Sequence, residues 1–122
     1  MIKIKTESKL NLTVFTAIGE VLIDEIITAL KNFYLGVTTK FTIWDFSEGT
    51  ASKLTRDDIR AVVDLSKNLS DVRKEGKTAI VAPSTLDYGM GRMLEIFADI
   101  QDLQFEINTF HSLSEAKKWL KL

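Results

Sequence analysis

The N-terminal segment alternates between apolar and charged residues with the period of a β-strand. Ile2 and Ile4 alternate with Lys3 and Lys5, which predicts a strand with one buried face. The lysines favour an edge strand, because charged side chains discourage pairing with a further chain. Segment 10–19 is rich in β-branched and aromatic residues and predicts a second strand, antiparallel to the first.

Further along the chain, apolar runs of strand length alternate with segments of helical period. Three runs predict strands: 40–46, 77–83 and 103–110. Apolar residues at helical spacing predict four helices, within 19–36, 55–76, 84–100 and 112–122. The polar segment 47–54 is expected to be a loop. The order β-β-α-β-α-β-α-β-α predicts one α/β domain over 1–122, with a mixed, mostly parallel five-stranded sheet, an N-terminal antiparallel hairpin and four helices.

The predicted helix 84–100 contains two glycines, which are unfavourable in a helix interior. Its buried stripe is expected to comprise Leu86, Met90, Met93, Phe97 and Ile100. Gly89 falls at the edge of this stripe, where the missing side chain would let another backbone approach closely. The alternative is an anion cradle, in which N–H groups near Ser84 bind the anion and Arg92 closes over it. The segment has no nucleotide-binding fingerprint, and both interpretations stay open.

The ends of the predicted parallel strands supply further candidates, because ligands of such sheets bind where strands end and helices begin. Asp45 and Ser47 follow an apolar run. The Asp45 carboxylate would either accept backbone N–H bonds in its own turn or act as a general base. His111, the only histidine, is expected to be a partly exposed loop residue. Beside Asp45, it would complete a base and its orienting group in a small hydrolase or transferase.

Composition argues against several classes of function. The net charge of −1 gives no field that would attract nucleic acid or an anionic membrane. With one histidine and no cysteine, no metal site is expected. No segment has the length of a membrane span or the pattern of a signal peptide, so we expect a cytoplasmic protein without a cofactor. Segment 73–77 is expected to be a solvated helix end, and Trp119 to dock the last helix or serve a homodimer interface.

Three stretches of the sequence have a familiar pattern: "FTIWDFSEG", "TAIVAPSTLDYGMGRMLEIF" and "FHSLSEAKKWL". The most particular feature is the arrangement of Tyr88, Gly89, Arg92 and Met93. With the element order, these stretches make the chain resemble the STAS group, the sulfate-transporter and anti-sigma-factor-antagonist domains. It is most similar to the small stand-alone bacterial members described as SpoIIAA-like and compared with CRAL-TRIO domains. The resemblance implies a four-helix, mixed-sheet domain that binds ligands or partners and has no recognised catalysis.

The leading hypothesis is therefore a non-enzymatic binding or regulatory module, which meets a small anionic or lipid-like ligand or a partner protein at the carboxyl ends of its strands. The candidate residues are Asp45, Ser47, Ser84, Tyr88, Gly89, Arg92 and His111. One alternative is the hydrolase or transferase described above. The other is a partner-switching protein, because a serine at the start of the second helix is phosphorylated in the regulatory members that the chain resembles. Here only Thr55 offers a hydroxyl at that place, in a helix-capping role.

Overall fold

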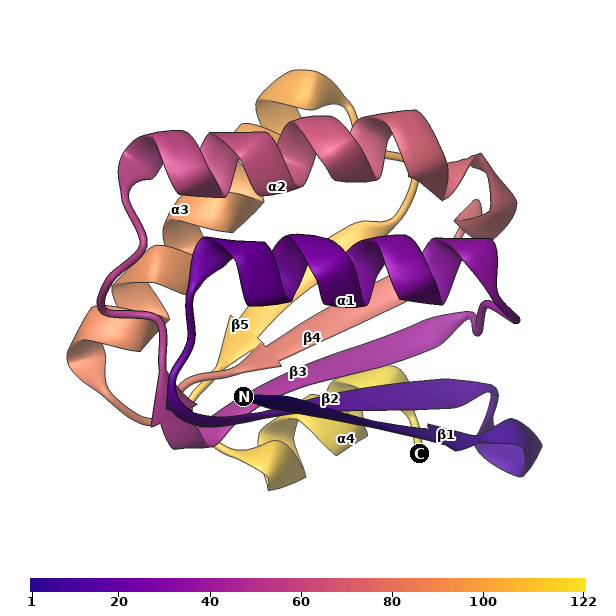
Figure 1. Cartoon of the computed structure of the whole chain (residues 1–122). Helices are drawn as coiled ribbons and strands as arrows, with labels where there is room; N and C mark the ends of the chain where they lie inside the picture. Colours follow the sequence, from indigo (N-terminus) through magenta and orange to yellow (C-terminus); the bar gives the residue numbers. More distant parts are fainter.

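A five-stranded mixed sheet forms the centre of the computed structural model, which describes residues 1–122 (Figure 1). The strands are β1 (Ile2–Glu7), β2 (Leu12–Glu20), β3 (Phe41–Thr50), β4 (Lys77–Val81) and β5 (Glu106–Phe110). They lie in the order β1-β2-β3-β4-β5, with β1 antiparallel to β2 and all other pairs parallel. The predicted mixed sheet with one antiparallel edge strand is confirmed.

Four helices cover the two faces of this sheet unequally. They are α1 (Ile23–Leu35), α2 (Arg56–Leu69), α3 (Thr85–Gln101) and α4 (Leu113–Leu120), with short 3₁₀ helices at Ser8–Leu10 and Ser70–Arg73. Each connection between parallel strands advances by one strand in the same direction. Because such connections are right-handed, their helices lie on the same face of the sheet. Figure 1 shows α1, α2 and α3 on that face and α4 on the other. No helix is both long enough and apolar enough to cross a membrane.

The sheet therefore has an apolar core on each side. Under α1 to α3 the largest cluster comprises Ala17, Val21, Ile26, Leu30, Ala51, Leu54 and Ile59. Under α4 it comprises Leu12, Ile43, Ala79, Val81, Ala116 and Leu120. Trp119 packs against this second cluster, with its ring centroid 5.5 Å from that of Phe110. The prediction that Trp119 docks the last helix is confirmed, whereas a role in an interface stays a prediction.

Strand β3 is longer than the sequence suggests. Segment 47–54 is not a loop throughout, in contrast to the prediction: its first four residues belong to β3, and Glu48, Gly49 and Thr50 pair with β2. The register shifts where Thr16 pairs with Asp45 and Ile18 pairs with Glu48, so that β3 has one extra residue in a bulge. Just beyond, a Cβ on Gly49 would lie 2.7 Å from the backbone of Ala17. The expectation missed this extension because small and polar residues are typical of loops.

The buried face of α3 also differs from the predicted stripe. Leu86 and Ile100 are 58% and 74% exposed, whereas the buried residues of α3 are Asp87, Gly91 and Ala98. Gly89 is exposed, and a Cβ there would meet no atom within 4 Å. The close approach predicted at Gly89 is therefore wrong, and Gly91 is the glycine that packs. Met90, Met93 and Phe97 are partly buried and pack against the core, so the middle of the predicted stripe is confirmed and its two ends are wrong.

Segment 73–77 contains a buried arginine rather than only solvated charges. Arg73 is 4% exposed, and its Nε and Nη2 donate to the carbonyls of Thr39 (2.9 Å) and Lys40 (3.0 Å). Further hydrogen bonds reach Tyr34 Oη, Thr42 Oγ1, Thr78 Oγ1 and the Lys77 carbonyl. The guanidinium lies 5.4 Å and 4.7 Å from the ring centroids of Phe33 and Phe105. Arg73 thus ties together the segments that lead into β3 and β4, and the expectation of a solvated helix end is wrong for this residue.

Candidate functional site

Tyr88 and His111 form a stacked aromatic pair at the carboxyl edge of the sheet. Tyr88 lies in the first turns of α3, which begins after β4, and His111 directly follows β5. The two rings are nearly parallel, with centroids 4.0 Å apart and an interplanar angle of 8°. His111 is exposed and Tyr88 is half-buried. The convergence of strand ends at one edge therefore brings two candidates from distant segments into contact.

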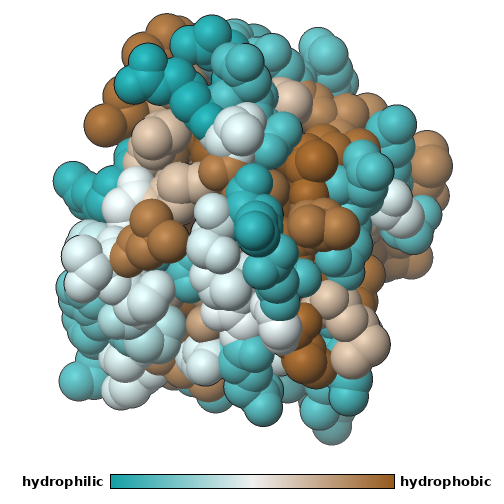
Figure 2. Space-filling view, turned by 60° about the vertical axis from the view of Figure 1, so that its left-hand side comes forward, coloured by the Kyte–Doolittle hydropathy of each residue, from teal (hydrophilic) through white to brown (hydrophobic).

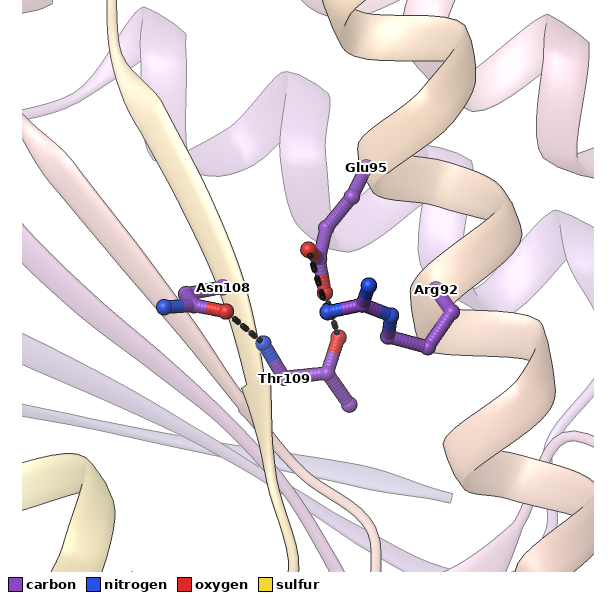
Figure 3. Close-up of polar contacts among 4 residues, drawn as sticks. All are labelled: Arg92, Glu95, Asn108 and Thr109. Carbon is purple, nitrogen blue, oxygen red and sulfur yellow. Dashed lines mark hydrogen bonds and ion pairs between the residues drawn. The ribbon is translucent and has the colours of Figure 1, made fainter.

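Arg92 lies one helical turn beyond Tyr88 and is held by Glu95. Arg92 Nη1 donates to Glu95 Oε1 at 3.3 Å, and Glu95 Oε2 accepts a 2.6 Å hydrogen bond from Thr109 Oγ1 (Figure 3). The side chains of Arg92 and Glu95 are 57% and 15% exposed. Glu95 is thus fixed against β5, while the other guanidinium donors of Arg92 have no protein partner. The i,i+3 spacing of Arg92 and Glu95 permits their contact, but the sequence has no signal for the bond to Thr109, which depends on the packing of α3.

Ser84 and Asp87 fill the N-terminus of α3. Asp87 N–H donates to Ser84 Oγ (3.2 Å), and Ser84 Oγ donates back to Asp87 Oδ2 (3.0 Å). The other carboxylate oxygen, Asp87 Oδ1, accepts from Thr50 Oγ1 (3.0 Å) and from the Ala51 N–H (2.9 Å). Because a buried carboxylate of the protein already occupies this end of the helix, the geometry disfavours the anion cradle at Ser84. The Ser-x-x-Asp spacing was the available signal for this cap.

Asp45 and Ser47 are bound to each other rather than to the aromatic pair. Asp45 Oδ1 accepts from the Ser47 N–H (2.9 Å) and from Ser47 Oγ (2.6 Å), so the predicted backbone N–H bond is confirmed, although these residues lie at the bulge of β3 and not in a turn. Strand β4 separates β3, which carries Asp45, from β5, which precedes His111. No hydrogen bond or ion pair joins Asp45 to His111 in the structure. The base and orienting group required by the hydrolase hypothesis are therefore not assembled.

The remaining candidates lie apart from the aromatic pair or add no contact to it. Thr55 caps α2: its hydroxyl accepts from the Asp58 N–H (3.1 Å), and its own N–H donates to Asp58 Oδ2 (2.9 Å). The predicted capping box is confirmed. Gly89 leaves open space beside Tyr88 and Arg92. Figure 2 brings forward the side of the molecule at which the parallel strands end. It shows a broad pale area with separate brown patches, so no single continuous apolar surface covers this side.

A small interior cavity lies between the sheet and α1 to α3. Its volume is about 90 Å³, and most of its lining is apolar, including Phe15, Trp44 and Leu94. The charged groups on its wall, Arg73 and Asp87, both have protein partners. Sites for small molecules typically measure roughly 300–1,000 Å³. The interior therefore has too little room for a lipid chain, and the exposed edge is the better candidate for ligand binding.

No family model matches the chain, and no curated protein matches its sequence. The fold and the site define an α/β domain that presents a stacked tyrosine–histidine pair and a partly free arginine at one edge of its sheet. We call the surface formed by Tyr88, Arg92 and His111 the rim site.

Proposed function

We propose that the chain is a non-enzymatic binding module whose rim site takes a small anion that carries a planar ring. The observation that carries this proposal is the nearly parallel stack of the half-buried Tyr88 and the exposed His111 beside Arg92. An exposed ring face accepts a further planar group by offset stacking. A guanidinium with free donors binds a phosphate or carboxylate through charge-assisted hydrogen bonds.

Glu95 supports a binding role by setting the position of Arg92. Because Glu95 is bonded to Thr109 on β5 and also to Arg92, the guanidinium is oriented before a ligand arrives. Less side-chain entropy is then lost on binding. Glu95 also lowers the net positive charge at the site, so the anion must gain affinity from stacking as well. This favours an aromatic anion over a bare phosphate or carboxylate.

The geometry supports binding better than catalysis. Asp45 is engaged with Ser47, and His111 with Tyr88, so neither is placed to activate the other. The four-helix, mixed-sheet architecture agrees with what the resemblance to the STAS group implies. We therefore include in the proposal that the chain is a STAS-like domain of a cytoplasmic protein, and that the aromatic anion is a free ligand or a side chain of a partner protein.

A titration with phenyl phosphate, followed by the amide resonances of ¹⁵N-labelled protein, tests the rim site. We expect saturable shifts at residues 88–92 and at His111, and weaker binding of inorganic phosphate and of phenol, because each lacks one of the two recognised groups. Arg92→Ala should weaken binding about tenfold, as expected for loss of a charge-assisted hydrogen bond. His111→Ala should remove the preference for phenyl phosphate over inorganic phosphate.

Arg56→Ala is the matched control, because Arg56 is an exposed arginine at the start of α2 with no side-chain hydrogen bond or ion pair. This variant should bind phenyl phosphate like the parent protein. Equal affinities of Arg92→Ala and Arg56→Ala, or shifts that map away from the rim site, would overturn the proposal.

A further inference from the structure

Strand β5 is a free edge of the sheet. It pairs only with β4, through hydrogen bonds such as Glu106 N–H to the Gly76 carbonyl (3.0 Å) and Ala82 N–H to the Phe110 carbonyl (2.8 Å). Backbone groups of successive residues in a strand point to opposite sides. Those of residues 107 and 109 therefore point away from β4.

One of these outward groups already has a partner. The Thr109 N–H donates to the side-chain Oδ1 of Asn108 at 3.1 Å (Figure 3). The N–H and carbonyl of Ile107 and the carbonyl of Thr109 have no partner within the chain. Unpaired groups of this kind can form a ladder with a further strand.

A groove runs along this edge between α3 and α4. Its volume is about 380 Å³, and we call it the β5 groove. Its lining includes Glu95, Asp99 and Asp102 on the α3 side, Glu106 and Ile107 on β5, and Trp119 on α4. The edge is thus accessible at residues 106–108, with walls on both sides that would contact the alternate side chains of an added strand.

The charge of the groove indicates what it accepts. Four of its lining residues are carboxylates, and none is lysine or arginine. Glu95 is paired with Arg92, and Glu106 has a long contact with Lys77 (4.0 Å), whose ammonium also lies 5.1 Å from the Trp119 ring centroid. Lys67 donates to the backbone carbonyl of Asp102 (3.2 Å), but the carboxylates of Asp99 and Asp102 form no ion pair. A second copy of β5 would place these carboxylates against their equivalents, and that repulsion disfavours pairing of two β5 edges.

We propose that the β5 groove binds an extended segment of a partner protein, in which basic and apolar residues alternate, as a sixth strand. Its backbone pairs with Ile107, its basic side chains face Asp99 and Asp102, and its apolar side chains face Trp119. This surface is separate from the rim site in ligand and in charge, because it takes a cationic peptide where the rim site takes an anion. The two surfaces share no residue, although Glu95 of the groove also accepts a hydrogen bond from Arg92.

The peptide acetyl-Lys-Val-Lys-Val-Lys-Val-Lys-amide is the probe, titrated into ¹⁵N-labelled protein. We expect saturable shifts centred on Ile107 and Thr109, with slower hydrogen exchange at the Ile107 amide. A peptide of the same sequence with every backbone nitrogen methylated keeps the charge but can donate no hydrogen bond to the ladder, and it should bind much more weakly. A peptide with glutamate in place of lysine should not bind.

A variant with altered charge on the α3 side of the β5 groove provides the second part of the test. The double variant Asp99→Lys, Asp102→Asn should weaken binding about tenfold, because it removes the two carboxylates that the basic side chains would face. Glu20→Lys, at the exposed end of β2, is the matched control and should leave binding unchanged. His111→Ala should also bind the peptide normally, so a failure of the rim site and a failure of the β5 groove give different results.

Three outcomes would overturn the proposal. Equal binding of the methylated peptide would show attraction of charge alone, without strand addition. Shifts confined to another surface would place the peptide elsewhere. Concentration-dependent self-association that broadens the Ile107 amide and is reversed by the peptide would identify a second copy as the occupant, because the chain's own β1 also alternates isoleucine with Lys3 and Lys5.

Discussion

Gly91 and Thr109 bring α3 into direct contact with β5. A Cβ at position 91 would lie 2.7 Å from both Thr109 Cγ2 and Thr109 Oγ1. Thr109 is buried and donates to Glu95, so its side chain cannot rotate away without losing that hydrogen bond. This contact sets the distance between the helix that carries Tyr88 and Arg92 and the strand that leads to His111, and the rim site depends on it.

The two glycines of α3 should respond to alanine in opposite directions. Gly91→Ala should lower the free energy of unfolding by about 1–2 kcal/mol, because overpacking against Thr109 outweighs the gain in helix propensity. Gly89→Ala adds a methyl group in open space and should raise the free energy of unfolding by up to about 1 kcal/mol. Urea denaturation of both variants gives the comparison. If Gly91→Ala were as stable as Gly89→Ala, the close packing of α3 on β5 would be contradicted.

Loss of the Arg73 guanidinium should be among the most damaging single changes in the protein. Arg73→Met leaves the carbonyls of Thr39 and Lys40 without their hydrogen-bond donor. Arg73 has no carboxylate partner, so the loss comes from these unpaired acceptors. A buried acceptor left without its donor costs about 1–3 kcal/mol, and this change affects both carbonyls. Guanidinium chloride denaturation measures the loss. Lys74→Met, which changes the exposed neighbouring residue, is the control. A loss of stability of similar size in this variant would argue against a specific role for Arg73.

The capping box of α2 predicts a smaller and chemically selective effect. Thr55→Ala removes the acceptor for the Asp58 N–H and should lower the free energy of unfolding by about 1 kcal/mol. Thr55→Ser keeps the hydroxyl and should retain most of that stability. Thermal unfolding of the two variants distinguishes the cap from the lost methyl group. Equal losses in both would mean that packing of the methyl group, and not the hydrogen bond, stabilises this end of α2.

The order of the elements could be predicted from the sequence because it depends on local periodicity. The alternation of Ile2 and Ile4 with lysines indicated an edge strand, and the strand occupies an edge. The burial of Asp87 and Arg73 could not be predicted in this way. Both are charged, and charged residues are rarely buried without partners. Their partners, such as Thr50 and Thr39, lie far from them in the sequence, so only the packed structure reveals them.

The candidate site was predictable only in part, for a related reason. The rule that parallel strands end at one edge placed His111 among the candidates, and the arrangement of Tyr88, Gly89, Arg92 and Met93 added Tyr88. Neither showed which candidates touch. Asp45 lies on the same edge and is bound to Ser47 instead. Strand order decides this outcome, because β4 lies between β3 and β5. Periodicity contains no information on which side chains face each other across intervening strands.

Glu25 should make stability depend on pH in the acid range. Its hydrogen bond to the Met1 amine, 2.8 Å from Oε2, and its bond to the Leu22 N–H hold the pKa of Glu25 below its ordinary value of 4.5. A carboxyl with a lowered folded-state pKa stabilises the protein above the unfolded pKa, and the contribution is lost as the pH falls through the folded pKa. Glu25→Gln keeps an acceptor for Leu22 but has no charge. It should therefore melt below the parent protein at about pH 6, and the difference should shrink by about pH 2.5. Glu20→Gln, which has no ion pair, serves as the control for thermal unfolding at both pH values, and a Glu25→Gln difference that persists in acid would contradict the assignment.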